Sequence, residues 1–494
     1  MYNMKYIDIS GGTVMASEKI INYVNGRSCA ILGLGVSNLP IAEQLYDAGV
    51  KLYVYDKNTP EKIGERAVRL AEKGVLFLGE EYTHTELSGE LIFRSPGVRP
   101  DRKGIADAIA RGAEVVSEIE LFLRLTDADI FAVTGSDGKT TSTTLTGKFL
   151  ESHAKKLKNS KAYVGGNIGT PLLPICDEIC AADLVALELS SFQLMSVKRA
   201  PRRVAITNVS PNHLDWHTDM NEYISAKTNI IGEQTERLVT NAEYPVTLDI
   251  AKKYKDIKEL YLFSSSKKSF EEFESAIGFA PTLVFFDKDG YIVSSDGYKE
   301  ERLLDVSLIN LPGKHNLENF MTAIALTYGV ADTDDFSEVA KSFFGVEHRL
   351  EFVREISGVR FYNSSIDSSP SRTAAALSAM KGKSLVIICG GYDKKIPYAP
   401  LGEAICRHGD VKALITTGAT ADKIRDAVKD YAEQNGVSAP RIIESETFEG
   451  AVQMAALLAK SGDNVLLSPA SASFDRFKNF MERGDLFKAL VNNL

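Results

Sequence analysis

Near residue 130 the chain reads Ile130-Phe131-Ala132-Val133-Thr134-Gly135-Ser136-Asp137-Gly138-Lys139-Thr140-Thr141. An apolar run of the kind that forms a buried strand ends in a short loop between two glycines, and Lys-Thr-Thr opens a predicted helix. The backbone N–H groups at a helix start are unpaired and lie at the positive end of the helix dipole. The pattern therefore predicts a binding site for phosphate groups.

The residue types in this loop suit a nucleotide. We expect the ammonium group of Lys139 to reach the outer phosphates and the hydroxyl group of Thr140 to bind Mg²⁺. The long form of the phosphate-binding loop has a glycine where this chain has Val133, so the match is to the shorter form Gly-x-x-Gly-Lys-Thr. The alternative is a glycine-rich turn with an exposed lysine. The order of strand, loop, lysine and hydroxyl disfavours it.

Length and composition exclude several classes of protein. A chain of 494 residues is too long for one hydrophobic core, so we expect about three domains. The net charge of −9 disfavours a nucleic-acid surface. The five cysteines are scattered and complete no zinc site, which indicates reduced thiols. We find no signal-peptide pattern between Met1 and Arg27 and no bilayer-spanning apolar run, and therefore predict a cytoplasmic protein without membrane insertion.

The first part of the chain has the pattern of a β-α-β unit. A predicted strand at 28–32 runs into Gly33-Leu34-Gly35-Val36-Ser37-Asn38, and after a helix the strand at 50–55 ends at Asp56. A Gly-x-Gly turn followed by an acid about twenty residues later is typical of dinucleotide-binding folds. Because Asn38 replaces the third glycine, two readings have comparable weight. The turn binds a pyrophosphate, of NAD or of a UDP-sugar, or it is a plain turn with Asp56 as a strand-end cap.

Polar residues also follow the central apolar strands. Glu188 ends a predicted strand at 184–188, and a magnesium-binding carboxylate is expected at such a position downstream of a phosphate-binding loop. After the next strand, at 204–208, come His213, Asp215 and His217. His213 is the better metal candidate, because a capped, solvated loop explains the other two equally well. Lys227 follows on a predicted helix.

The remaining pattern completes the fold prediction. Asn316 and Asn319 lie on one face of a predicted helix, where paired amides suit a purine edge or cap the helix equally well. After Gly345 the alternation of strands and helices starts again. We therefore predict an α/β protein with three domains: an N-terminal Rossmann-like domain (1–124), a central P-loop ATPase-like domain (125–346) and a C-terminal Rossmann-like domain (347–494).

Six motifs are spread along the chain. Four of them are Thr134-Gly135-Ser136-Asp137-Gly138-Lys139-Thr140-Thr141, Gly166-Asn167-Ile168-Gly169, Gly313-Lys314-His315-Asn316-Leu317-Glu318-Asn319 and His348-Arg349. Together they resemble the Mur ligases, the ATP-dependent amide ligases of peptidoglycan precursor synthesis. The other two are Glu188-Leu189-Ser190-Ser191-Phe192-Gln193-Leu194 and Leu467-Ser468-Pro469-Ala470-Ser471-Ala472-Ser473-Phe474-Asp475-Arg476-Phe477-Lys478-Asn479-Phe480 followed by Glu482-Arg483-Gly484. These two are similar to the family member that adds D-glutamate. The resemblance covers nearly the whole chain, and it is weakest before Arg27 and between Asn241 and Leu304.

The resemblance implies an activity and its substrates. ATP phosphorylates a carboxyl group, and the amine of an amino acid attacks the acyl phosphate to form an amide. The substrates implied are ATP, UDP-N-acetylmuramoyl-L-alanine and D-glutamate, with two Mg²⁺ sites, and we expect a monomer. Lys139, His213 and Lys227 are implied in catalysis, with Lys227 as a carbamate, which needs a neutral, desolvated amine. The alternative for Lys227 is a surface lysine on a helix.

The resemblance also implies four groups of binding residues. The nucleotide is expected to contact Gly135, Ser136, Asp137, Gly138, Lys139, Thr140, Thr141, Asn316, Asn319, His348 and Arg349. The implied metal ligands are Thr140, Glu188, His213 and Lys227. The UDP-substrate is expected to contact Gly35, Val36, Ser37, Asn38, Asp56, Ser95, Pro96, Gly97 and Asn167. The amino acid is expected to contact Ser368, Lys394, Ser473 and Phe480.

The chain departs from the family pattern at two places. The loop that usually reads Asn-Asp-Ser-Lys-Ala-Thr-Asn is here Asn363-Ser364-Ser365-Ile366-Asp367-Ser368-Ser369. Ile366 thus stands where a lysine would help to neutralise the glutamate side chain, and Ser364 stands where an aspartate would be. The candidates for the missing charge are Arg372, Lys394 and Lys395. Ser471 replaces the usual cysteine, which argues only that a thiol is dispensable.

Other functions remain open on the sequence. One is a Mur-family ligase for a different amino acid, and a folylpolyglutamate-type enzyme is disfavoured because it lacks the N-terminal unit with Gly33 and Asp56. Another is a non-catalytic nucleotide-binding relative, although neither the phosphate-binding loop nor the metal ligands are broken. The third is an NAD oxidoreductase, suggested by the first domain alone.

Overall fold

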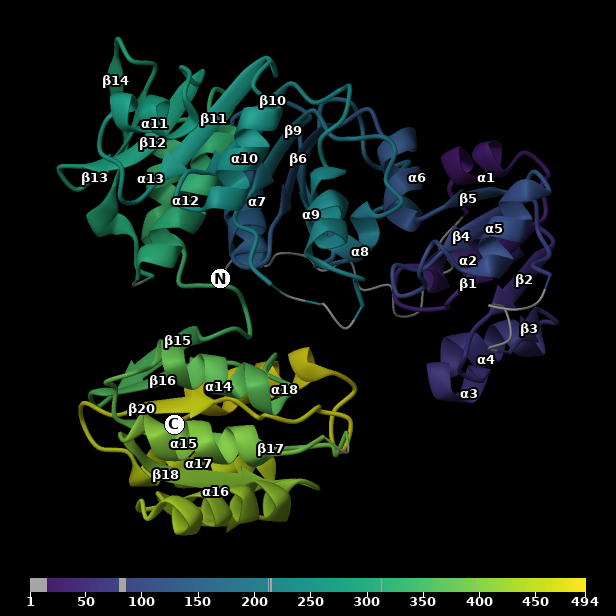
Figure 1. Ribbon diagram of the computed structural model, residues 1–494. Coiled ribbons are helices and arrows are strands. Elements are labelled where there is room, and N and C mark those ends of the chain that lie inside the picture. Colours follow the sequence, from purple (N-terminus) through teal and green to yellow (C-terminus); the bar gives the residue numbers. More distant parts are fainter. Residues whose placement is uncertain (1–15, 80–85, 212, 214–215, 312, 395) are drawn as a thin grey trace. The chain divides into compact units, whose positions relative to one another are not determined.

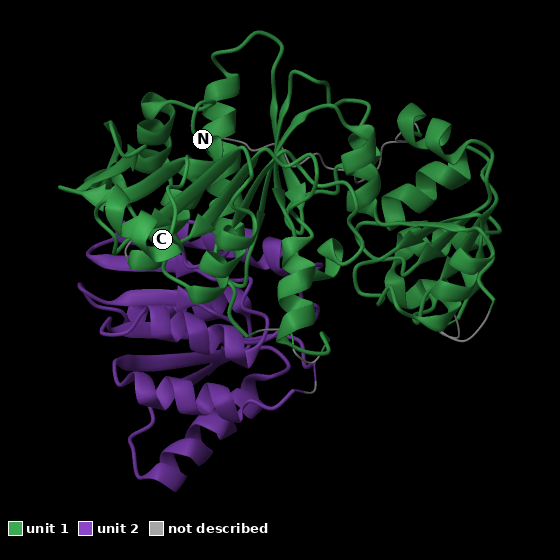
Figure 2. Ribbon diagram, turned by 45° about the horizontal axis from the view of Figure 1, so that its top comes forward, with its two compact units in different colours: residues 1–343 green, residues 344–494 purple. Residues whose placement is uncertain are grey.

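The computed structural model describes residues 16–79, 86–211, 213, 216–311, 313–394 and 396–494. Asp215 and Lys395, both named above as candidates, lie outside the described residues. The chain divides into two compact units, one ending at Phe343 and the other beginning at Phe344 (Figure 2). The first unit contains two β-sheets and the second contains one (Figure 1).

The first sheet has five parallel strands in the order β3-β2-β1-β4-β5. Its strands are β1 (Cys29–Leu32), β2 (Leu52–Tyr55), β3 (Leu76–Leu78), β4 (Leu91–Arg94) and β5 (Glu114–Val116). Its helices are α1 (Glu18–Val24), α2 (Leu39–Asp47), α3 (Pro60–Ile63), α4 (Glu65–Glu72), α5 (Lys103–Ala110) and α6 (Glu118–Leu125). The central strand β1 is buried at every position, which is why it reads as an unbroken apolar run.

The second sheet has nine strands in the order β14-β13-β12-β11-β10-β9-β6-β8-β7. They are β6 (Asp129–Thr134), β7 (Ala162–Gly166), β8 (Leu184–Glu188), β9 (Arg203–Ile206), β10 (Arg237–Asn241), β11 (Glu259–Ser264), β12 (Leu283–Lys288), β13 (Tyr291–Ser295) and β14 (Glu300–Asp305). Strands β6 to β12 pair in parallel, and β13 and β14 add an antiparallel edge. The carboxyl ends of β6, β7, β8 and β9 therefore lie at one edge, where open α/β sheets bind ligands.

The helices of this second sheet begin with α7 (Lys139–Ala154), the helix after the phosphate-binding loop. The others are α8 (Ser191–Leu194), α9 (Met220–Thr228), α10 (Pro245–Lys253), α11 (Phe270–Ile277), α12 (Lys314–Thr327) and α13 (Thr333–Ser342), with short 3₁₀ turns at Leu173–Ile175 and Val306–Leu308. Helices α7 and α12 pack side by side (Figure 1). Phe149 of α7 contacts Phe320 of α12 and Phe336 of α13, with ring centroids 6.3 and 4.9 Å apart. This packing holds the start of α12 beside the start of α7.

The third sheet, in the second unit, has six strands in the order β15-β16-β20-β17-β18-β19. They are β15 (Glu351–Ile356), β16 (Val359–Asn363), β17 (Leu385–Gly390), β18 (Val411–Thr417), β19 (Arg441–Ser445) and β20 (Asn464–Leu467), all parallel except β15. Its helices are α14 (Pro370–Ala379), α15 (Ala399–His408), α16 (Ala421–Asn435), α17 (Phe448–Leu458) and α18 (Phe480–Asn492).

The structure confirms the predicted α/β class. The strand expected at 50–55 is shorter and begins at Leu52. The segment between Asn241 and Leu304, where the resemblance was weakest, extends the second sheet by the strands β11 to β14, which we did not predict. None of the described helices has the length and apolar character needed to cross a membrane.

Candidate nucleotide and substrate site

The loop between β6 and α7 has a backbone that only glycine tolerates at two positions. Gly138 has a φ of +77°, and an added Cβ atom would collide with the Asn319 side chain. Gly135 has a φ of +152°, and its Cβ atom would collide with the hydroxyl group of Thr207. Helix α7 starts at Lys139 with no side chain capping its first turn, so its N–H groups remain available to an anion.

The end of the neighbouring strand β9 holds this loop in shape. The backbone N–H of Asp137 donates to Asn208 Oδ1 over 2.9 Å, and the carbonyl oxygen of Asp137 accepts from Thr207 Oγ1 (2.6 Å) and Asn208 Nδ2 (3.1 Å). Our sequence reasoning assigned no role to Thr207 or Asn208. They lie some seventy residues beyond the loop, and only the parallel pairing of β6 with β9 brings them to it.

Lys139 and the paired amides also lie at this loop. Lys139 Nζ donates to the Ser136 carbonyl oxygen over 2.9 Å, which folds the side chain back over the loop. Ser142 Oγ of α7 donates to Asn319 Oδ1 over 3.2 Å, and Asn319 Nδ2 lies 3.3 Å from Asn316 Oδ1. The structure thus brings the start of α12 to the phosphate-binding loop, as a site that contacts both phosphates and a base would require.

Glu188 ends β8 and has one carboxylate oxygen without a partner. The residue is 1% exposed, and its Oε1 accepts a hydrogen bond of 2.7 Å from Asn167 Nδ2. Its Oε2 is buried and, within the described part of the chain, has no hydrogen-bond partner. An unpaired buried carboxylate oxygen is costly unless a cation or a proton occupies it, so the site fits a Mg²⁺ ligand. Asn167, assigned above to the UDP-substrate, lies at this carboxylate.

Lys227 is a buried residue of α9. Its side chain is 1% exposed, Nζ donates to the Gly135 carbonyl oxygen over 2.6 Å, and the ammonium lies 4.5 Å from the centre of the Tyr223 ring. Burial, together with the positive charge of Lys139, lowers the pKa of Lys227 from 10.5 to about 7, although the carboxylates of Asp137 and Glu188 oppose the shift. The alternative of a surface lysine is therefore wrong, and the amine is partly neutral at pH 7.

The two histidines after β9 have different environments. His213 is exposed, has a φ of +55°, and its ring lies 5.0 Å from the ring of Phe192. His217 is buried, with Nε2 at 2.9 Å from Ser191 Oγ and Nδ1 at 3.3 Å from Glu222 Oε2. His217 is therefore buried against Ser191 and Glu222, whereas His213 is exposed.

In the first sheet, two loops meet at the carboxyl ends of β1 and β4. Gly35 and Val36 are exposed, and a Cβ atom on Gly33 would lie 2.9 Å from Cβ of Ser95. The loop that continues through Pro96 and Gly97 therefore packs directly against the Gly-x-Gly turn. The exposed glycines of the two loops, Gly35 and Gly97, leave room for a pyrophosphate to approach the backbone.

Two predicted contacts in these loops prove to have partners within the protein. Asn38 is 1% exposed, and its Nδ2 donates to the Gly33 carbonyl oxygen over 3.0 Å. The Asp56 carboxylate accepts from the backbone N–H groups of Leu34 and Asn58, each over 2.7 Å. Asp56 thus acts as a strand-end cap, which is one of the two roles that the sequence left open for it. Between Asn38 and the turn, Ser37 is half-buried and Val36 is 80% exposed.

The comparisons with known proteins agree with this geometry. A UDP-N-acetylmuramoylalanine–D-glutamate ligase of Ruminiclostridium cellulolyticum is 44% identical over 481 residues, which cover 97% of this chain and 99% of that protein. Proteins of the same name from Acetivibrio thermocellus and Clostridium perfringens are 43% and 38% identical over 95% and 96% of this chain. The chain belongs to the Mur ligase family.

Family descriptions match all three parts of this Mur ligase. Residues 27–117 match the "Mur ligase MurD-like, N-terminal domain", 133–327 the "Mur ligase middle domain" and 348–471 the "Mur ligase, glutamate ligase domain". The crystal structure of UDP-N-acetylmuramate-alanine ligase MurC from Thermotoga maritima superposes with a TM-score of 0.52 over 94% of this chain and 99% of that one, and at 17% identity it shares the fold alone. The three-domain α/β fold is confirmed, whereas boundaries after residues 124 and 346 stay predictions.

His348 and Arg349 lie close to the start of the second unit of the Mur ligase. Arg349 is exposed, but His348 is buried, with Nδ1 at 3.0 Å from Asn363 Nδ2 and its ring 5.9 Å from that of Phe480. His348 and its neighbours Glu347 and Asp485 come close enough together to hold a cation. However, the ammonium of Lys488 already pairs with Glu347 and with Asp485. We therefore assign no metal to this cluster, and a contact of His348 with a nucleotide stays a prediction.

Arg483 is the buried centre of the loops that follow β16 and β20. It is 2% exposed, and its guanidinium donates to Ser365 Oγ (3.0 Å) and to the carbonyl oxygens of Ser365 (2.8 Å), Ser471 (3.1 Å) and Ala472 (3.1 Å). Sequence reasoning quoted Arg483 within a motif but gave it no role. The motif Glu482-Arg483-Gly484 could have indicated this role, because the arginine of the motif holds the loops together here.

The predicted amino-acid contacts lie around these loops. Lys394 is exposed, and its Nζ lies 3.5 Å from the carbonyl oxygen of Ser368, which is half-buried. Ser473 is buried just beyond the two carbonyl groups that Arg483 holds, and the Phe480 carbonyl oxygen accepts from Ser365 Oγ over 2.7 Å. The structure thus links Phe480 through Ser365, and Lys394 through Ser368, to the segment 363–369.

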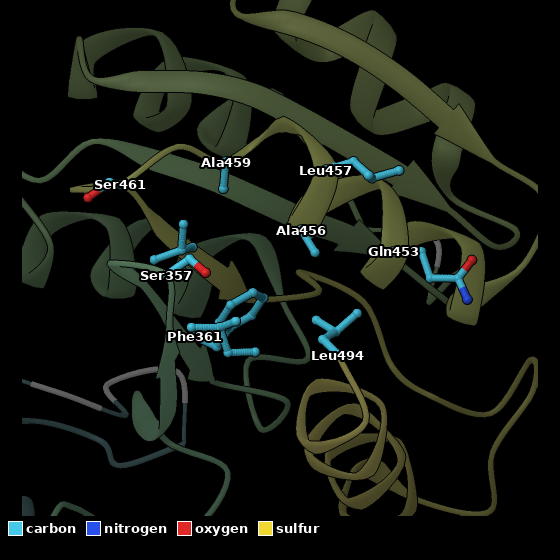
Figure 3. Close-up of a pocket in the computed structure, with 10 residues that line it drawn as sticks. Ser357, Phe361, Gln453, Ala456, Leu457, Ala459, Ser461 and Leu494 are labelled. Carbon is cyan, nitrogen blue, oxygen red and sulfur yellow. The ribbon is translucent and has the colours of Figure 1, made fainter.

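A pocket of about 520 Å³ lies at the other end of the third sheet (Figure 3). It is lined by Ile356, Ser357, Val359, Phe361, Gln453, Ala456, Leu457, Ala459, Ser461 and Leu494. These residues belong to the end of β15, the turn into β16 and the first half of β16, to α17 and the segment between α17 and β20, and to Leu494, whereas the loops described above follow the carboxyl ends of β16 and β20. The pocket is therefore not part of the candidate site.

Proposed function

We propose that this chain joins D-glutamate to UDP-N-acetylmuramoyl-L-alanine through an acyl phosphate. As a Mur ligase it is an ATP-dependent ligase. The observation that carries the proposal is the group formed by the phosphate-binding loop, the unpaired Glu188 carboxylate and the buried Lys227 at one edge of the central sheet. This group suits phosphoryl transfer, and relatives at 38–44% identity that bear the D-glutamate ligase name support the choice of substrates.

In the first step the γ-phosphoryl group of ATP passes to the carboxylate of the UDP-substrate, and ADP leaves. The first-turn N–H groups of α7 and the ammonium of Lys139 neutralise charge on the phosphates. The amides of Asn316 and Asn319 and the exposed Arg349 hold the nucleotide. The loops at Gly35–Ser37 and Ser95–Gly97 hold the diphosphate of the UDP-substrate, and Asn167 orients its muramoyl part.

In the second step the amine of D-glutamate attacks the acyl carbon, and phosphate leaves. The attacking amine has to be deprotonated, and cations stabilise the oxyanion that forms. Ser368, Lys394, Ser473 and Phe480 surround the amino acid in this proposal. No protein nucleophile is required, because the acyl phosphate is already an activated carboxyl group.

Two Mg²⁺ ions would complete the proposed site, and Thr140, Glu188, His213 and Lys227 would hold them. When bound, Mg²⁺ neutralises charge on the transferred phosphoryl group. For Lys227 to serve as a ligand it has to become a carbamate, in which the neutral amine takes up CO₂ and releases one proton. Its low pKa supports this, because the neutral amine is then present at pH 7.

The proposed carbamate makes the activity depend on CO₂. Removing CO₂ from the buffer is expected to lower the initial rate, and bicarbonate is expected to restore it. The loss should be larger below pH 7 than above it, because the amine is mostly protonated below its pKa of about 7. Initial rates in degassed and bicarbonate-containing buffers between pH 6 and 9 measure the effect. Equal rates in both buffers at every pH would reject the carbamate.

Glu188→Gln is expected to weaken Mg²⁺ activation. The amide keeps the shape of the side chain and its contact with Asn167, but it removes the negative charge at the buried oxygen. The Mg²⁺ concentration for half-maximal rate should rise by about 10-fold or more, since one charged ligand is lost. Glu178→Gln, an exposed acid of the same unit, is the control. An unchanged Mg²⁺ requirement would remove Glu188 from the metal site.

We further propose that the enzyme works as a monomer in the cytoplasm, where ATP and UDP-linked precursors are present. Size-exclusion chromatography with light scattering tests the first part. A mass near 54.1 kDa is expected, and a mass near twice that value would contradict it.

The decisive experiment is ATP-dependent phosphate release with UDP-N-acetylmuramoyl-L-alanine and a panel of amino acids: D-glutamate, L-glutamate, D-aspartate, L-lysine and meso-diaminopimelate. Release with D-glutamate alone is expected. Release with another amino acid would keep the chemistry and move the substrate, whereas no release with any of them would favour a non-catalytic protein. Binding of NAD, without binding of the UDP-substrate, would point to an oxidoreductase.

A further inference from the structure

The segment Ser364–Ser369 lacks the lysine that the family resemblance expects at position 366. Ile366 is half-buried and carries no charge. A D-glutamate substrate brings two carboxylates to this edge of the third sheet, and each has to exchange its hydration for donors on the protein. One of those donors is missing at position 366, so another part of the chain has to provide it.

Arg372 lies directly against this position. It belongs to the first turn of α14, and its NH1 donates to the Ile366 carbonyl oxygen over 3.1 Å. Its side chain is exposed, and among the described residues no carboxylate lies within ion-pair distance of it. One of its five N–H donors is thus used by the loop, and the rest of the guanidinium remains available for a ligand.

Two other cations face the same loop. The positive charges of Arg372 and Arg483 both act on Lys394, whose pKa lies below its ordinary value chiefly because of partial burial and then because of these two charges. Asp367 is the acid of the loop, and it is buried with its Oδ2 accepting from Ser468 Oγ over 2.8 Å. Burial raises the pKa of Asp367, while the charges of Arg349 and Arg372 lower it. The positive charges of Arg349, Arg372 and Arg483 thus act on one buried carboxyl group, and this surplus suits a substrate with two negative charges.

Of these cations, Arg483 is the least available to the side chain of a substrate, because four of its five N–H donors bind groups within the protein. It is buried, and its four hydrogen bonds hold the protein loops together. Lys394 has the position that the family resemblance already assigns to the amino acid. Arg372 has no such assignment. Its guanidinium contacts the backbone of Ile366, the residue that stands in place of the lysine.

We propose that Arg372 binds the side-chain carboxylate of the incoming acidic amino acid and thereby replaces the lysine expected at Ile366. This inference rests on the proposed function. A guanidinium presents a planar pair of donors to a carboxylate, which gives a bidentate contact that one ammonium cannot make. Arg372 is thus a specificity-determining residue for a distal carboxylate on the amino acid.

The test uses steady-state phosphate release by the full-length enzyme with D-glutamate and with D-glutamine, which has the same shape but no side-chain charge. In Arg372→Gln the KM for D-glutamate should rise by roughly 10- to 100-fold, the usual range for loss of a charged hydrogen bond. The KM values for ATP, for the UDP-substrate and for D-glutamine should stay within about 2-fold. Arg372→Lys should lie between the wild type and Arg372→Gln.

The double variant Ile366→Lys, Arg372→Gln provides a charge-rescue test. It rebuilds the family arrangement, and its KM for D-glutamate should return to within about 5-fold of the wild-type value if the two positions serve the same carboxylate. Arg441→Gln, at an exposed position of β19, is the matched control and should leave all constants unchanged. Thermal melting of each variant shows whether it is folded.

The outcomes separate the two proposals. If the wild type uses D-glutamate but Arg372→Gln has an unchanged KM, or loses D-glutamate and D-glutamine turnover equally, the role of Arg372 is rejected and the proposed function stands. A wild type that turns over no acidic amino acid rejects both. A folding defect in Arg372→Gln leaves Arg372→Lys to decide, because its charge is retained while the bidentate geometry is lost.

Discussion

Lys139→Ala is expected to lower ADP formation by about 10³-fold, since removal of one preorganised charge from a phosphoryl-transfer site has effects of this order. The side chain lies over the phosphate-binding loop, where Nζ donates to the Ser136 carbonyl oxygen. The phosphates would replace that weak neutral acceptor with charged oxygens, and the interaction should strengthen as charge moves to the leaving ADP. The loss should therefore be seen mainly in kcat.

The control for this experiment lies at the other end of the same helix. Lys155→Ala removes an exposed lysine from the end of α7 and should leave turnover unchanged. Calorimetry should show that Lys139→Ala still binds the UDP-substrate with an affinity within about 2-fold of wild type, because that ligand is assigned to the loops of the first sheet. Turnover by Lys139→Ala at the wild-type rate would contradict the phosphate-binding role.

Lys227→Met is expected to abolish turnover and to stabilise the fold. Turnover should fall by at least about 10²-fold, because methionine can neither ionise nor form a carbamate. Holding a lysine at a pKa of about 7 instead of 10.5 costs about 4 kcal/mol at pH 7 relative to a side chain that does not ionise. Loss of the hydrogen bond to Gly135 and of the contact with Tyr223 offsets about 2 kcal/mol of this. We therefore expect a net gain of about 2 kcal/mol.

The predicted gain in stability of Lys227→Met depends on pH. Between pH 7 and 10.5 the unfolded lysine holds a proton that the folded lysine has lost, so wild-type stability should rise with pH across this window. The advantage of Lys227→Met should shrink accordingly as the pH rises. Urea unfolding in CO₂-free buffer measures it, with Lys252→Met, at an exposed position on α10, as the control. A stability difference that does not change with pH would show that the buried amine does not titrate as stated.

Much of the site could be predicted because its parts are contiguous in the chain. The loop from Gly135 to Lys139 and the strand that ends at Glu188 could be predicted from neighbouring residues. Strand, turn and helix depend on local periodicity and on the positions of glycine. The same reasoning failed for the clamp formed by Thr207 and Asn208. Nothing near these two residues indicates that Asp137 lies beside them, and the contact exists only because β6 and β9 pair in parallel.

The local sequence pattern also could not show which of several similar polar residues has its partner within the protein. His213 and His217 stand four positions apart in one polar segment, yet only His217 is buried against Ser191 and Glu222. Asp56 follows a Gly-x-Gly turn in the way of a ligand-binding acid, yet its carboxylate accepts from Leu34 and Asn58 within the protein. In both cases the sequence indicated a polar residue that suits a ligand site. It did not show that the partner of this residue lies within the protein.

From the order of its residues alone this protein is an α/β chain with a phosphate-binding loop and the motifs of an ATP-dependent ligase, because those features depend on neighbours along the chain. The ionisation of its buried side chains could not be predicted in this way, because burial depends on segments that are distant in sequence. Lys227 meets Gly135 across 92 residues, and its burial together with the positive charge of Lys139 lowers its pKa. Arg372 meets Ile366 by the folding of one loop onto a helix start. The tertiary structure therefore decided that the buried Lys227 loses its proton more readily than an exposed lysine, and that Arg372 lies beside Ile366.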